Sequence, residues 1–187
     1  MVMKLDMKQL ICDKLIEMMD QTSLHKIKVV DLCKYSEISR STFYLYFESV
    51  YDAAQYIEDM FLNGLPSEAS ISHDRIFSQE NLDKSHPATE ERLAYWNDNA
   101  RILKALLGEN GDPAFQMRIA NRVWRMTKKN FESVTSFSES ELRVFSSYIA
   151  GGQSEVLSRW ARSNSEVSLD DLVALIDRIT MHILKML

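Results

Sequence analysis

The sequence predicts an all-α protein, and two observations support this fold class. Apolar residues recur at spacings of three and four along most of the 187 residues, which is typical of helices that bury one face. Glycine and proline, which interrupt helices, number only five and three. With 45% apolar residues, a chain of this length can build one medium domain or two small ones with an ample core.

Charge and targeting signals exclude several classes of protein. The net charge of −5 excludes a generally basic nucleic-acid coat protein, although residues 26–47 hold four basic and two acidic side chains. No apolar run typical of a signal peptide is visible at the N-terminus, and no stretch has the ~18 apolar residues of a membrane span. We therefore expect a cytoplasmic protein. Cys12 and Cys33 occupy apolar positions of the helical pattern, which favours buried structural thiols over a redox switch.

The N-terminal part predicts a helix followed by two shorter ones. Residues 3–21 have apolar side chains at helical spacing, and a second apolar segment is followed by a three-residue break over 36–38 and a short segment from Ser39 to Phe47. Ser39 is a good helix N-cap, because its hydroxyl can accept a hydrogen bond from a backbone N–H of the next turn. Two short helices joined by such a turn predict a helix-turn-helix. That motif places the first residues of its second helix against base edges in the major groove.

The second helix of this pair has a composition suited to DNA. Phe43 and Phe47 fall on one face and would anchor the helix to a core, whereas its first turn is basic and rich in hydroxyls. Tyrosine hydroxyls and basic groups can bind phosphate oxygens. Periodicity alone leaves open a helix pair with no DNA-binding role. The candidate DNA-binding residues are Lys28, Ser39, Arg40, Ser41, Thr42, Tyr44 and Tyr46.

The run D-L-C-K-x-S-x-I-S-R-S-T-F-Y-x-Y-F over residues 31–47 closely resembles the N-terminal DNA-binding domain of TetR-family transcriptional regulators. The resemblance implies a three-helix DNA-binding domain, assigned to residues 1–50, that continues into a fourth helix from Val50 to about Leu62. The apolar pattern of that helix predicts an inner face made of Tyr51, Ala54, Ile57 and Phe61.

Two positions depart from the family pattern. Glu37 stands where the family usually has glycine, which predicts a strained turn because non-glycine residues resist positive φ. Val50 stands where a basic residue is usual, so one expected phosphate contact is missing.

Helical periodicity returns after a linker over 67–89. The expected helices cover 90–107, 114–134, 138–162 and a last segment that opens at Ser168. Gly151 and Gly152 lie in the middle of the third of these helices, where each costs ~1 kcal/mol relative to alanine. We expect close approach of another helix to offset this cost.

The C-terminal sequence also resembles one TetR subgroup, in which a Gly-Gly pair is followed by Trp and a Ser-initiated final helix. The run L-L-G-E-N-G-D-P-A-F over 106–115 is similar to the same subgroup. The resemblance implies that residues 51–187 form a helical effector-binding and dimerisation domain, whose last two helices make a four-helix bundle with those of a second copy. The predicted dimer-interface residues are Gly151, Gly152, Trp160, Ile176, Ile179 and Ile183.

No catalytic constellation is visible in the sequence. The four histidines have no nucleophile or carboxylate at motif spacing, and no Gly-rich phosphate loop is present, so we expect no enzyme, no metal site and no cofactor. Two functions stay open: a homodimeric repressor released from a palindromic double-stranded DNA operator by a small-molecule effector, and a TetR-like co-activator acting through protein contacts. The candidate ligand-binding residues, for which plain core is an equal alternative, are Trp96, Phe115, Trp124, Phe145 and Tyr148.

Overall fold

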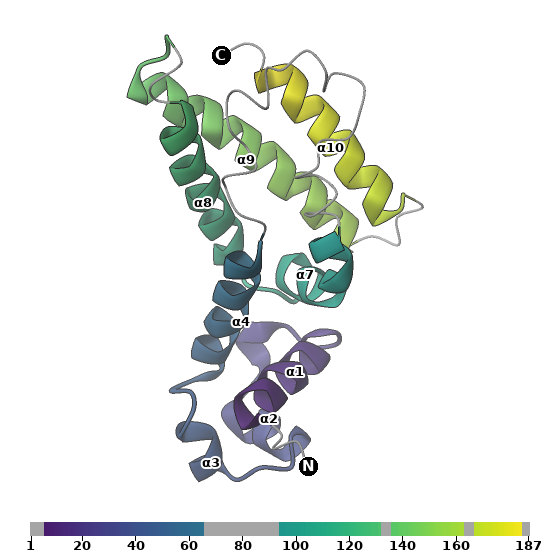
Figure 1. Cartoon of the computed structure of the whole chain (residues 1–187). Helices are drawn as coiled ribbons and strands as arrows, with labels where there is room; N and C mark the ends of the chain where they lie inside the picture. The colour runs from purple at the N-terminus through teal and green to yellow at the C-terminus, as the bar shows by residue number, and fades with distance from the viewer. Residues whose placement is uncertain (1–5, 66–93, 132–135, 163–166, 185–187) are drawn as a thin grey trace, which may run out of the picture.

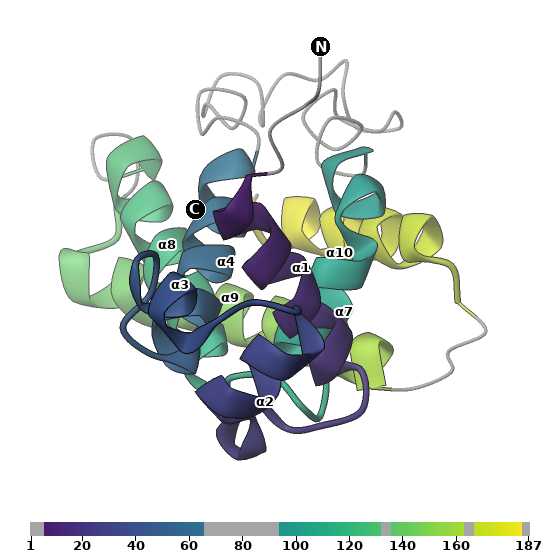
Figure 2. The same ribbon diagram turned by 90° about the horizontal axis from the view of Figure 1, so that it is seen from below.

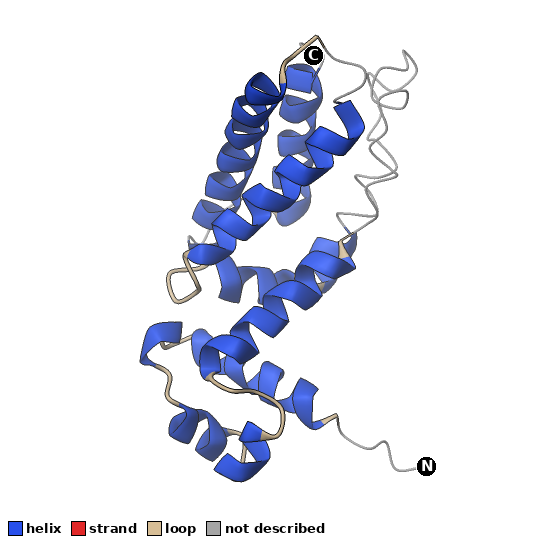
Figure 3. Ribbon diagram, turned by 90° about the vertical axis from the view of Figure 1, so that its left-hand side faces the viewer, coloured by secondary structure: helices blue, strands red, loops and turns tan. Residues whose placement is uncertain are grey.

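The computed structural model describes residues 6–65, 94–131, 136–162 and 167–184. All regular elements in these ranges are helices, and they contain no strand (Figure 3). The predicted all-α class is therefore confirmed. The linker predicted over 67–89 lies outside the described residues. Within them, no helix has both the length and the apolar character needed to cross a membrane.

The N-terminal helices form a head at one end of an elongated molecule (Figure 1). The elements are α1 (Met7–Met19), the 3-10 helix η1 (Leu24–Lys26), α2 (Val29–Tyr35), α3 (Arg40–Tyr44) and α4 (Val50–Gly64). α1 begins after Asp6, whose carboxylate accepts a hydrogen bond from the backbone N–H of Lys8 at 3.0 Å. α4 begins at Val50, as predicted, because the Ser49 hydroxyl accepts a hydrogen bond from the Asp52 N–H at 3.1 Å.

The remaining helices form a body at the other end. Its elements are a helical segment over 94–98, α7 (Ala100–Leu107), α8 (Ala114–Phe131), α9 (Glu139–Arg162) and α10 (Leu169–Leu184). α8 and α9 run antiparallel along each other, and α10 lies beside α9, joined to it by a 2.8 Å hydrogen bond from Gln153 Nε2 to Thr180 Oγ1. Seen from the head end, α1 and α2 lie in front of this body (Figure 2).

The helix predicted over 90–107 is interrupted at Asn99 within its described part. A helical segment over 94–98 ends there, and α7 begins at Ala100. The side-chain amide of Asn99 donates to the carbonyl oxygen of Tyr95 at 2.8 Å. The backbone N–H of Asn99 donates to the same oxygen at 3.1 Å, but the backbone of Asn99 leaves the helical conformation, with φ −112° and ψ 18°. The prediction of one continuous helix is therefore wrong at this residue.

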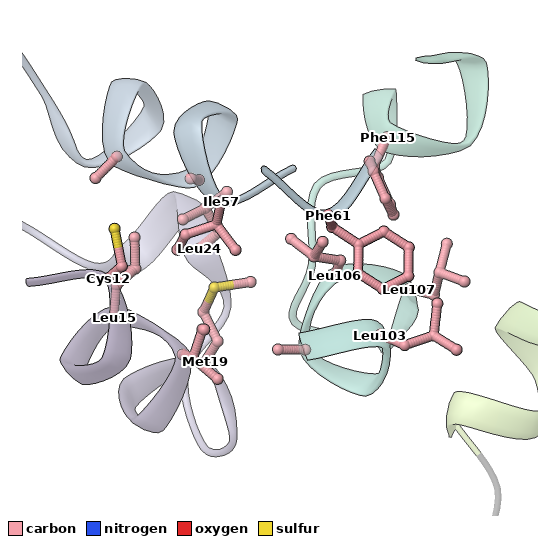
Figure 4. Close-up of a cluster of buried hydrophobic side chains, with 14 of the residues drawn as sticks. Cys12, Leu15, Met19, Leu24, Ile57, Phe61, Leu103, Leu106, Leu107 and Phe115 are labelled. Atoms are coloured by element: carbon pink, nitrogen blue, oxygen red, sulfur yellow. The ribbon is translucent and has the colours of Figure 1, made fainter. Parts of the chain in front are cut away.

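One hydrophobic core joins the head to the body (Figure 4). It runs from Leu15 and Met19 of α1 to Leu106 of α7 and Phe115 of α8, all of which are at most 2% exposed. Phe61, near the end of α4, bridges the two parts, and its ring centroid lies 6.2 Å from that of Phe115 in an edge-to-face contact. Because α4 packs against both the head and the body, the division of the chain into two domains at residue 50 stays a prediction.

In the first turn of α4, the buried side chain is not the one that was predicted. Tyr51 was expected to point inward, but its side chain is 53% exposed. Val50 is buried in its place, at 4% exposure, and continues the inner face through Ala54 and Ile57. The position at which the resembled family usually has a basic side chain is therefore part of the core of this head.

Candidate nucleic-acid interface

The turn between α2 and α3 uses a backbone conformation that favours glycine. Glu37 has a φ of 55°, which for a non-glycine residue costs about 1–2 kcal/mol. The strain predicted for this position is therefore confirmed. The turn is closed by hydrogen bonds from the N–H of Ile38 to the carbonyl oxygen of Cys33 at 3.0 Å and from the N–H of Glu37 to that of Lys34 at 3.3 Å. This pair of bonds is the Schellman arrangement, which ends α2 and requires positive φ at Glu37.

A cluster of hydroxyls caps α3, the second helix of the helix-turn-helix. The Ser39 hydroxyl accepts a hydrogen bond from the Thr42 N–H at 3.0 Å, as expected for an N-cap. The same oxygen lies 2.7 Å from Ser41 Oγ and 2.8 Å from Thr42 Oγ1. Three hydroxyls in the first turn are thus linked to one another, which restricts their rotamers before any ligand binds.

Two buried rings fix the orientation of α3, which has only five residues. Phe43 is fully buried and Phe47 is 3% exposed, and their ring centroids lie 6.1 Å apart. Phe47 also contacts Tyr56 of α4 at 5.7 Å between centroids. The ammonium of Lys8 lies 3.7 Å from the centroid of the Tyr56 ring, a cation–π contact that ties α1 to the same cluster.

The predicted DNA-binding side chains lie on the outer side of this support. Tyr44 and Tyr46 are 51% and 40% exposed, although both are aromatic. Arg40 and Ser41 are exposed in the first turn, and Thr42 is half-buried. The exposed residue at the N-cap of α2 is Lys28. Exposed hydroxyl, phenol and guanidinium groups are therefore present on α3 and just after it, and an exposed ammonium is present at the start of α2.

The head is fastened to the body by the loop between α7 and α8, a role that was not predicted. The side-chain amide of Asn110 donates to the carbonyl oxygen of Met19 at 2.9 Å. It also accepts a hydrogen bond from the Ser23 hydroxyl at 3.0 Å. The backbone oxygen of Asn110 accepts a further bond from the Leu24 N–H at 2.9 Å. The sequence signal for this loop was the Gly-Glu-Asn-Gly-Asp run, in which an Asn between two glycines follows a helix.

A buried ion pair makes a second link between the head and the body, and it joins α4 to α8. Glu58 of α4 is fully buried, and Arg118 Nη2 forms an ion pair with its Oε2 atom. Arg118 also contacts Asp112 Oδ2 at 2.9 Å. Burial lowers the pKa of the Arg118 guanidinium. Arg118 is the cation that the described residues place against the buried carboxylate of Glu58.

The five residues predicted to bind an effector lie in different surroundings. Phe115 belongs to the core between head and body, and half-buried Trp96 packs against the same core. Trp124 faces the guanidinium of Arg143 of α9 at 5.5 Å. Phe145 and the 70% exposed Tyr148 border a shallow surface groove of about 510 Å³. The five side chains therefore lie in a core, beside a cation and at a surface groove, and the effector site stays a prediction.

Most of the predicted dimer residues share one apolar surface. A groove of about 470 Å³ lies between α9 and α10, and among the residues that line it are Gly151, Gly152, Ile176, Ile179 and Ile183. Trp160 lies apart from this groove, since its indole N–H donates to the carbonyl oxygen of Val167 at 3.1 Å and its ring faces the ammonium of Lys104 at 4.9 Å. Both glycines are exposed, and a Cβ added to either would meet no atom within 4 Å.

Comparisons with known proteins place this arrangement in a family. A family model described as "Transcriptional regulator C-terminal region", of the TetR type, matches residues 83–182, more than half of the chain. The dihydroxyacetone kinase operon activator DhaS has a similar structure, with a TM-score of 0.58 at 17% identity over 96% of this chain and 94% of that one. The fatty acid degradation regulator FadR from Bacillus halodurans has a TM-score of 0.59 at 15% identity, over 95% and 94%. A search of curated proteins gives no match.

At these identities the solved structures show the fold, and the family model shows the family. The helix-turn-helix with its exposed α3, the all-helical body and the match over the C-terminal half agree with one another. The chain belongs to the TetR family of transcriptional regulators, DNA-binding helix-turn-helix proteins that are not enzymes.

Proposed function

We propose that the protein is a homodimeric repressor that binds a palindromic operator through α3 of each subunit and leaves it when a small molecule binds the body. The observation that supports this most directly is the exposed polar face of α3. Hydroxyls linked around Ser39 and two half-exposed tyrosines, Tyr44 at the end of α3 and Tyr46 just after it, lie beside the buried rings of Phe43 and Phe47. A surface fixed in this way is suited to recognising one DNA sequence, because little side-chain freedom is lost on binding.

Within this surface we assign two kinds of contact. Arg40, Ser41 and Thr42 lie in the first turn of α3 and would reach base edges in the major groove. Tyr44, Tyr46 and Lys28 would hold phosphates, which position the head without reading sequence. Ser39 would act through its cap, by fixing the other hydroxyls.

The proposed dimer is supported by the groove between α9 and α10. Two exposed glycines in a 24-residue helix lower its stability by roughly 1 kcal/mol each relative to alanine. Within the described part of the chain, no atom lies close enough to either glycine to offset that cost. Close packing of the same helices of a second copy would do so. Replacing Gly152 by Leu should raise the dimer dissociation constant about tenfold or more, because overpacking a close contact costs roughly 1–3 kcal/mol. The subunit should stay folded, since a Cβ at this position meets no atom within 4 Å. Sedimentation equilibrium measures this, and a monomeric wild-type protein at micromolar concentration would rule the dimer out.

One observation keeps a co-activator function as a second candidate. The buried Val50 leaves the start of α4 without its usual basic side chain, and an apolar groove that includes Val144 and Tyr148, 72% and 70% exposed, lies on the N-terminal half of α9. Weaker DNA binding combined with an exposed apolar surface would suit a protein partner. The effector itself is proposed only as a ligand of residues 90–150.

Selection from a random DNA pool tests the main proposal. We expect a palindrome with two half-sites to be enriched. Arg40→Ala should then relax the preference for that sequence, at a cost of roughly 1–3 kcal/mol. Tyr44→Phe, which removes one hydroxyl, should weaken all sequences alike. Lys28→Ala should lower the slope of log K against log salt by about one unit. If no palindrome is enriched, the repressor proposal fails and the partner-protein function takes its place.

A further inference from the structure

Leu45, at the C-cap of α3, is the large apolar residue with the highest exposure in the described part of the chain, at 80%. It follows Tyr44 directly and precedes Tyr46, both of which are polar at their tips. Its neighbours in the sequence on the buried side, Phe43 and Phe47, are at most 3% exposed. Leu45 therefore takes no part in holding α3 against the head.

The position of Leu45 on the helix places it beside the polar first turn. Residues three and four apart are neighbours on a helix surface, and Leu45 lies at those distances from Thr42 and Ser41. The Leu45 N–H donates to the carbonyl oxygen of Thr42 at 3.2 Å, and the backbone of Leu45 keeps right-handed helical dihedral angles, with φ −73° and ψ −20°. The side chain of Leu45 thus extends the surface that begins with Ser41.

A leucine on such a surface has one apolar target in DNA. In the major groove, the base edges present hydrogen-bond donors and acceptors, except for the C5-methyl group of thymine, which is apolar. Exposed apolar area that becomes buried on binding favours the complex. By contrast, cytosine has only a hydrogen at C5, so Leu45 would bury less apolar area there, and guanine and adenine present polar groups that would lose their water.

We propose that Leu45 is a specificity-determining residue that packs on the methyl group of one thymine in each operator half-site. This inference rests on the proposed operator binding and adds to it a required base. Base selection at that position comes from the methyl group alone, with no hydrogen bond from Leu45. It is therefore separable from the selection by Arg40.

The test changes only the methyl group. In the operator obtained by selection, each thymine of the half-site is replaced in turn by uracil, which keeps every hydrogen-bonding group and lacks the methyl. At the thymine that Leu45 contacts, uracil in both half-sites should weaken wild-type binding about 15-fold. This is about fourfold per half-site, which corresponds to the roughly 0.8 kcal/mol gained by burying one CH₂ group. Leu45→Ala should bind the thymine and uracil duplexes equally, as measured by fluorescence anisotropy. Val30→Ala, at a 52% exposed apolar residue of α2, is the matched control and should keep the wild-type ratio.

A second arm restores the methyl group on another base. At the same position, 5-methylcytosine should bind the wild type several-fold more tightly than cytosine, and Leu45→Ala should not distinguish the two. A selected palindrome at which no thymine shows a Leu45-dependent uracil effect would overturn this inference and leave the repressor proposal intact. Failure to select any palindrome would overturn both.

Discussion

Replacing Arg118 by Met removes the only cation paired with the buried Glu58 in the described part of the chain. Loss of one partner of a buried pair costs about 3–5 kcal/mol, because the other charge stays uncompensated. Glu58 is fully buried, but the side chain of Arg118 is 30% exposed, so water can partly replace the guanidinium. We therefore expect the lower end of that range, about 3 kcal/mol. This is a large fraction of the roughly 5–15 kcal/mol by which native proteins are stable.

The assay is urea unfolding followed by circular dichroism, at one fixed protein concentration because association changes apparent stability. Arg125→Met is the matched control, since it removes a cation from an exposed position of the same helix and should change stability by less than about 0.5 kcal/mol. The double variant Glu58→Met with Arg118→Met should recover most of the loss, because no buried charge is left. A loss below about 1 kcal/mol for Arg118→Met, or a double variant no more stable than the single one, would refute this reasoning.

Two further predictions concern the link between head and body and the thiols. Asn110→Ala removes two side-chain hydrogen bonds to the head, one of them with Ser23, and should lower the free energy of unfolding by about 1–3 kcal/mol in the same urea assay. The control Glu109→Ala changes the exposed neighbouring residue and should have little effect. Equal losses for the two variants would contradict the role assigned to Asn110. Burial raises the pKa of the Cys12 thiol to about 12 and also raises that of Cys33. Because the thiolate is the reactive form, a thiol reagent at pH 8 should modify neither cysteine until the protein is unfolded, and rapid labelling of the native protein would show that these thiols are accessible.

The local features of the helix-turn-helix were determined by the sequence itself. The N-cap at Ser39, the inward spacing of Phe43 and Phe47 and the strained backbone at Glu37 were all predicted, and the structure has each of them. Each depends on interactions within about four residues, such as a side-chain hydroxyl with the next turn or the 3.6-residue repeat of a helix. Such local interactions can be predicted without knowing which other elements pack against the helix. The family match over the C-terminal half has the same origin, because it rests on residues in order along the chain.

What faces each helix was decided only by the tertiary structure. Periodicity placed Tyr51 inward, yet Val50 is the buried residue, because a wheel of 100° per residue leaves an error of one position unresolved at a helix end. Asn110 binds residues 87 and 91 positions away in the chain, and the fully buried Glu58 of α4 pairs with Arg118 of α8. The exposure of Leu45 likewise depends on which side of α3 the head leaves open. Contacts between distant segments form only when the helices pack together, so a single sequence shows which side chains are available but not which ones meet.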